Sequence, residues 1–235
     1  MNKNELLKSK NFLSYLTIRW FNTLAIQTIT LTVGWQIYEL TRNPLDLGLI
    51  GLAQFIPIFI FILPSGVVAD KFDRKIVIAI CNIIHLAVCF FLLFYSLSGP
   101  TSIVPILLVL LIHGTARAMY QPSLSAILPN IVEKKLFPNA TAYNSSVSKL
   151  GHLIGPLIAG IIISLFSIWV YLFAIFCFSI STIATFFLNN PKNPDNLKAI
   201  SFASVVSGFV YVWKTKLVLG TMTIDLFAVL FGGIM

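Results

Sequence analysis

Gly66–Lys75, which reads Gly-Val-Val-Ala-Asp-Lys-Phe-Asp-Arg-Lys, separates two long apolar runs in this 235-residue chain. Five of these ten residues are charged, whereas the flanking runs 47–69 and 76–97 are each long and apolar enough to cross a membrane. A turn this short and this charged between two membrane helices lies at the water interface, and its three cations indicate the cytoplasmic side. The rest of the chain can be oriented from this turn.

The composition excludes a soluble globular protein. Hydrophobic residues make up 57% of the chain and charged residues only 10%, which leaves too little polar surface to cover a globule of this size. The formal charge of +8 does not indicate a nucleic-acid partner, because twelve of the sixteen Lys and Arg lie in four short polar segments that alternate with turns holding only Arg42. This alternation is the positive-inside pattern, so the charge reflects topology and attraction to anionic lipid.

Seven apolar segments are long enough to span a membrane, and together they predict an all-α, multi-pass membrane protein with a cytoplasmic N-terminus. The predicted segments are 12–40, 47–69, 76–97, 103–128, 139–166, 168–188 and 217–235. The first is interpreted as a retained membrane helix, since it lacks the small-residue cleavage site of a signal peptide.

Polar residues on the first predicted helix recur at steps of three and four, which places them on one face. They are Arg19, Asn22, Thr23, Gln27, Thr30 and Gly34. Such a face avoids lipid, because an unpartnered polar group in hydrocarbon is costly. It either lines a substrate cavity, with Asn22 and Gln27 as candidates, or makes hydrogen bonds between helices.

The fourth predicted helix carries Arg117, four residues from both His113 and Gln121, so we expect the three side chains to share a face. An arginine in a membrane segment is costly and is a functional candidate by default. The alternative is a side chain that reaches the cytoplasmic interface. Asp225 in the seventh segment is a further cavity candidate.

The fifth predicted helix contains a run of small residues broken by Pro156. Small side chains let two helix backbones approach closely, and a proline weakens the helix at that contact. The predicted packing seam consists of Gly151, Gly155, Pro156 and Gly160. Taken alone, such a run is more typical of ordinary helix packing than of a functional element.

No pattern in the sequence indicates an enzyme, a cofactor or a metal site. Cys81, Cys89 and Cys177 all lie inside apolar runs, so no disulfide framework is expected, and no Cys/His spacing suits a metal. No nucleophile or pair of carboxylates converges. His85 has no evident partner in the sequence.

The charged turn resembles the signature loop between helices 2 and 3 of the major facilitator superfamily. The matching positions are Gly66, Asp70, Lys71, Arg74 and Lys75. Asp73 replaces a glycine of the general pattern, as in the drug and siderophore exporters related to the enterobactin exporter. The run from Gly151 is similar to the Gly-x-x-x-Gly-Pro-x-x-Gly-Gly signature of antiporters, with Ala159 in place of one glycine.

The resemblance implies the major facilitator fold, in which two six-helix bundles of 3+3 inverted repeats enclose the substrate between them. Residues 1–188 would form the N-terminal bundle, 189–216 a cytoplasmic linker with an amphipathic helix, and 217–235 the first helix of a truncated C-terminal bundle. The charged turn would act as a cytoplasmic gate against the second half. Arg117 corresponds to an arginine that is associated with proton coupling in some antiporters.

The function expected from this resemblance is proton-coupled export of amphiphilic small molecules, such as drugs or siderophores, by alternating access across the cell inner membrane. Its partners would be a small-molecule substrate, protons and the lipid bilayer. The alternative is a half-transporter inactive on its own, or a membrane partner subunit of a separate second-half chain.

Overall fold

The computed structural model describes residues 6–99, 101–166, 169–189 and 220. Most of the predicted linker and the seventh segment, with Asp225, lie outside these residues, as does the side chain of Asp70.

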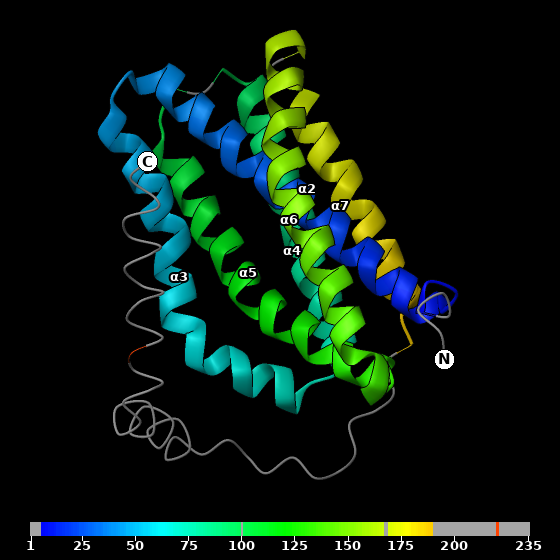
Figure 1. The fold of residues 1–235 in the computed structure, drawn as a ribbon. Helices are drawn as coiled ribbons and strands as arrows, with labels where there is room; N and C mark the ends of the chain where they lie inside the picture. Colours follow the sequence, from blue (N-terminus) through cyan, green and yellow to red (C-terminus); the bar gives the residue numbers. More distant parts are fainter. Residues whose placement is uncertain (1–5, 100, 167–168, 190–219, 221–235) are drawn as a thin grey trace. The chain divides into compact units, whose positions relative to one another are not determined.

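The described part of the chain is built from six long helices and one short 3₁₀ helix, with no strand (Figure 1). These are α2 (Lys10–Thr41), α3 (Pro44–Lys71), α4 (Arg74–Leu97), α5 (Val104–Ile131), η1 (Lys134–Leu136), α6 (Phe137–Phe166) and α7 (Val170–Phe187). The helices confirm the first six predicted segments. Five of them, α3 to α7, contain stretches with the length and apolar composition of a membrane span, whereas α2 carries the polar stripe that lowers its apolar content.

Two turns, 42–43 and 72–73, are shorter than predicted, because polar residues cap the helices that follow them. Asp73 is the N-cap of α4, and its Oδ1 accepts a hydrogen bond from the Lys75 amide at 2.9 Å. The aspartate that departs from the general loop pattern thus starts the next helix. Asn43 caps α3 in the same way, and Pro44 occupies the first turn, so α3 begins three residues before the predicted segment.

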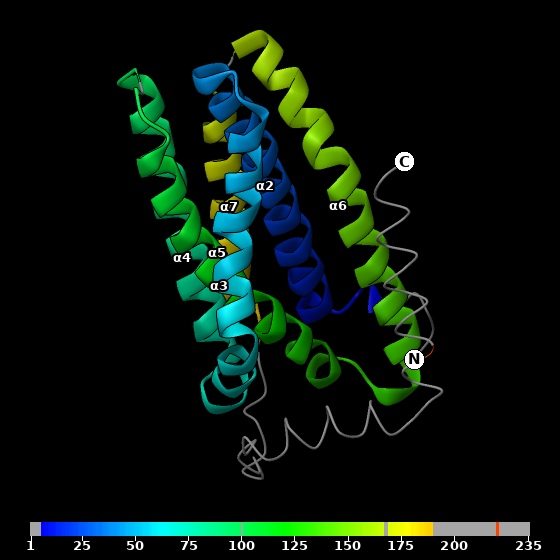
Figure 2. The same ribbon diagram turned by 90° about the vertical axis from the view of Figure 1, so that its left-hand side faces the viewer.

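The helices pack in a pattern that repeats within the bundle. Helix α2 packs against α6 and α7, α3 packs against α5, and α4 packs against α5 and α7 (Figures 1 and 2). Exchanging α2 with α5, α3 with α6 and α4 with α7 leaves this set of contacts unchanged. That symmetry is the one expected of two three-helix inverted repeats.

A polar chain of side chains crosses the core between α2, α4 and α7. The buried Asn22 donates from Nδ2 to Asn82 Oδ1 at 2.8 Å, and Asn82 Nδ2 donates to Ser181 Oγ at 3.1 Å. Each of these buried polar groups finds a protein partner, as burial away from water requires. These hydrogen bonds fix the position of α2 along its axis relative to α4 and α7, and they fix the position of the polar stripe in the same way.

Candidate functional site

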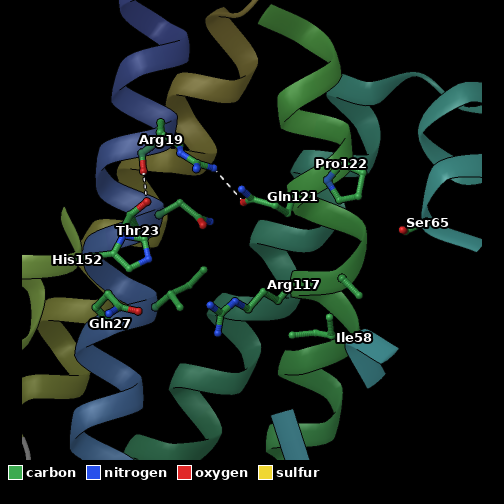
Figure 3. Close-up of a pocket in the computed structure, with 12 residues that line it drawn as sticks. Arg19, Thr23, Gln27, Ile58, Ser65, Arg117, Gln121, Pro122 and His152 are labelled. Carbon is green, nitrogen blue, oxygen red and sulfur yellow. Dashed lines mark hydrogen bonds between the residues drawn. The ribbon is translucent and has the colours of Figure 1, made fainter. Parts of the chain in front are cut away.

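A cavity of about 370 Å³ lies against the polar stripe of α2, with walls from α3, α5 and α6 (Figure 3). Its lining residues are Arg19, Asn22, Thr23, Ile26, Gln27, Ile58, Ser65, Arg117, Ala118, Gln121, Pro122 and His152. The structure therefore brings together three predicted cavity residues, Asn22, Gln27 and Arg117, from two helices. Both interpretations of the stripe apply at Asn22, which lines the cavity and also bonds to Asn82.

The polar stripe continues from this cavity into a second, more apolar hollow. Gln27 lines both, and the second hollow of about 500 Å³ also contains Thr30, Gly34, Trp35 and Tyr38. The stripe is thus the common wall of a charged region and an aromatic region.

Arg19 reaches from α2 toward α5 in this cavity (Figure 3). One of its terminal nitrogens donates to Gln121 Oε1 at 2.9 Å, and the other donates to Ser148 Oγ of α6 at 3.1 Å. Its Nε is buried and has no hydrogen-bond partner among the described residues. Arg19 was predicted to belong to the stripe but was not one of the predicted cavity residues.

Arg117 enters the same space from α5 and is held loosely (Figure 3). Its one hydrogen bond to a described residue is a long contact of 3.5 Å to Gln54 Oε1 on α3. Its side chain is half-buried and lines the cavity.

The expectation that His113 shares a face with Arg117 and Gln121 is wrong. Each four-residue step on an α-helix turns about 40° past a full circle. Two such steps, from Gln121 to His113, rotate the side chain direction by about 80°. His113 points into the core, where its Nδ1 lies 3.0 Å from Nδ1 of His85 on α4. Both Nε2 atoms are buried without a hydrogen-bond partner in the described part of the chain.

Two glycines of the predicted α6 seam lie directly against α2. A Cβ on Gly151 would lie 2.9 Å from Thr23 Cγ2, and a Cβ on Gly155 would lie 2.7 Å from Gln27 Cβ, so only glycine allows this approach to α2. Ala159 is fully buried. Gly160, which was also predicted to belong to the seam, is one residue off the four-residue spacing, and an added Cβ there would meet no described residue within 4 Å.

At the predicted cytoplasmic gate, two cations bind backbone carbonyls within this bundle. Arg74 is buried; its Nε donates to Ala69 O at the end of α3, and one terminal nitrogen donates to Ala126 O of α5, both at 3.0 Å. Lys75 Nζ donates to Phe186 O at the end of α7 at 2.8 Å. Cations at carbonyl ends of helices are favourable.

The predicted gate also includes Lys71 and Gly66. Lys71 is exposed in the last turn of α3, and Gly66 has open space around its Cα. A contact between this turn and a second half stays a prediction. Among the residues that the structure describes, no group of three or more His, Cys, Asp or Glu could hold a metal ion.

Comparison with known proteins places this architecture in a family. The chain is 26% identical over 163 residues to the staphyloferrin A transporter of Staphylococcus aureus, covering 67% of this chain and 38% of that protein. It is 23% identical over 141 residues to macrolide efflux protein A of Streptococcus pyogenes, covering 60% and 34%. It is 26% identical over 157 residues to the enterobactin exporter EntS of Salmonella choleraesuis, covering 65% and 37%.

The chain thus spans less than half the length of each of these three relatives. The family described as transmembrane secretion effector matches residues 8–232, nearly the whole chain. The match confirms the resemblance inferred from the charged turn, and the chain belongs to this family of major facilitator superfamily transporters.

Proposed function

We propose that this chain forms the N-terminal bundle of a proton-coupled exporter of amphiphilic small molecules, working by alternating access in the cytoplasmic membrane. The observation that carries the proposal is the cavity on α2, α5 and α6, where charged and amide side chains gather inside an otherwise apolar helix bundle. Ionisable groups in a membrane segment typically mark a substrate or ion path. Two of the named relatives are described as an efflux protein and an exporter, which favours the outward direction.

The geometry supports a rocking mechanism around this cavity. In the major facilitator fold the substrate binds near the membrane midplane, between two bundles that move largely as rigid bodies. Asn82 and Arg74 each join three helices of this bundle through buried hydrogen bonds, which suits movement as a unit. Substrate and proton would each favour a different facing state through differential binding.

Proton coupling is supported by Arg117 and by the α6 seam. Arg117 lines the cavity with little to hold it, so its contacts can change with substrate or proton occupancy. Gly151 and Gly155 of α6 lie directly against the cavity helix α2. The positive-inside pattern supports a cytoplasmic N-terminus.

The proposal is tested in everted membrane vesicles from cells that produce the complete protein encoded by the gene. Two fluorescent dyes, carboxyfluorescein and rhodamine 6G, are offered outside vesicles whose lumen is acidified. We expect uptake of at least one dye above that of vesicles without the protein, and its loss when a protonophore collapses the gradient. Uptake of neither dye above background, or uptake unchanged by the protonophore, would contradict proton-coupled export.

A further inference from the structure

Two guanidinium groups face the same cavity without a carboxylate. Arg19 from α2 and Arg117 from α5 both line it, and none of the other ten lining residues is Asp or Glu. Neither arginine has a carboxylate partner among the residues that the structure describes. The described wall of the cavity therefore carries unbalanced positive charge.

The hydrogen bonds of these arginines differ from those of the buried arginine in the same bundle. Arg74 binds two backbone carbonyls at 3.0 Å, which suits a structural role. Arg19 instead binds a side-chain amide and a hydroxyl and leaves its Nε without a described partner, and Arg117 makes one contact of 3.5 Å. Since an arginine within a membrane is normally paired, the two cavity arginines retain the capacity to bind an anion.

The charged cavity continues into an apolar one. The hollow of about 500 Å³ that shares Gln27 is lined by Trp35, Tyr38 and Leu31. A hollow of about 480 Å³ shares Arg117 and is lined mainly by apolar residues, Phe55 and Ile58 among them. A ligand that fills this continuous surface places a charged head between the arginines and an apolar body against the aromatic side chains.

We propose that the substrates of this transporter are amphiphilic anions bearing a carboxylate, and that Arg19 and Arg117 select them. The inference rests on the proposed function, and it names the substrate class of the same cavity. The planar fork of a guanidinium matches the two oxygens of a carboxylate, and such charge-assisted hydrogen bonds are about twice as strong as neutral ones. In a membrane interior a positive cavity also rejects cations.

The test measures dye binding to the purified complete protein in a non-ionic detergent by fluorescence polarisation. Carboxyfluorescein and rhodamine 6G share a xanthene ring system, but the first is an anion with free carboxylates and the second is a cation. We expect carboxyfluorescein to bind more tightly than rhodamine 6G. Arg117→Gln should weaken carboxyfluorescein binding on the order of tenfold, the effect of one lost charged hydrogen bond, and leave rhodamine 6G binding no weaker.

Arg117→Glu guards against a merely misfolded variant, because it should bind rhodamine 6G more tightly than the unchanged protein does. Lys134→Gln is the control; this cation is exposed in η1 and lines neither the cavity nor the two hollows, so both affinities should stay the same. The proposal is overturned if rhodamine 6G binds at least as tightly as carboxyfluorescein, or if Arg117→Gln and Arg117→Glu leave carboxyfluorescein affinity unchanged. Proton-driven export is measured separately, by uptake of both dyes into vesicles. The proposed function can therefore fail while the preference for carboxylates holds, and the reverse.

Discussion

Arg74 uses its charge inside the protein. It is about 8% exposed and donates to backbone carbonyls of two other helices, at Ala69 and Ala126. It therefore holds the ends of α3, α4 and α5 together at the charged turn. At least one cation of the charged turn, Arg74, therefore makes its hydrogen bonds within this bundle.

Arg74→Lys should lower the stability of the bundle although the charge is kept. A lysine presents one ammonium and cannot reach both carbonyls with a planar fork. Loss of one hydrogen bond to a charged group reduces the free energy of unfolding by about 1.5–3 kcal/mol. Thermal unfolding of the purified protein, followed with a thiol-reactive dye, measures the change because all three cysteines are buried. Lys71→Arg, at an exposed position, is the control and should have no effect.

The His85–His113 contact predicts a strong coupling between two residues 28 apart in the sequence. His85→Leu or His113→Leu alone leaves one buried ring without its partner, which should lower the free energy of unfolding by about 1–3 kcal/mol. The double variant removes both polar groups, so it should lose less stability than the two single losses together, by about 0.5–3 kcal/mol. Strictly additive losses would show that the two rings do not share a hydrogen bond.

The spacing of residues along one helix predicted which side chains of α2 share a face. The stripe on α2 was predicted from its three- and four-residue steps, and four of its residues line the first cavity. His85 was left without a partner, because a contact between two helices depends on their packing and not on spacing along either one. The same limit applies to Ser148, which binds Arg19 from a third helix.

Helix α6 contacts the cavity helix α2 through two glycines. Close approach brings Thr23 and Gln27 of α2 against Gly151 and Gly155. The sequence motif predicted close packing, but not which helix is the partner or that Gly160 lies outside the contact. The partner could not be predicted because small residues permit close approach to any apolar helix.

Gly155→Val should impair both stability and transport, whereas Gly160→Val should be tolerated. At Gly155 an added Cβ already lies 2.7 Å from Gln27 Cβ and 3.3 Å from Leu24 O, so α6 must move away from the cavity wall. At Gly160 an added Cβ meets nothing within 4 Å. Because both changes replace helical glycine with valine, their effect on helix propensity is similar, and the difference between them measures the contact. Equal thermal stability of the two variants would show that the seam has no energetic importance.

For the whole molecule, the number and order of the described helices followed from the apolar runs in the sequence, and five of the six long helices have the length and apolar composition of a membrane span. Which helices pack together did not follow, since apolar helices in lipid have no hydrophobic preference for one neighbour over another. The exchange symmetry between α2–α4 and α5–α7 appears only in the structure. Both α2 and α5, the first helix of each repeat, line the cavity.

If this cavity is a water-accessible substrate path, two neighbouring residues on α6 should differ in their exposure to water. His152 lines the cavity, whereas Leu153 is 72% exposed and is not one of the lining residues, so we expect lipid around it. Single cysteines are placed at each position, as His152→Cys and Leu153→Cys, in the complete protein in native membranes. The three cysteines of this chain are buried and contribute little background.

The measurement is the rate of labelling by a membrane-impermeant maleimide applied from either side. We expect rapid labelling of His152→Cys from at least one side and little labelling of Leu153→Cys, because maleimides react with the thiolate that forms in water. Equal labelling of the two positions, or labelling of Leu153→Cys alone, would show that the cavity is not the aqueous path through this bundle.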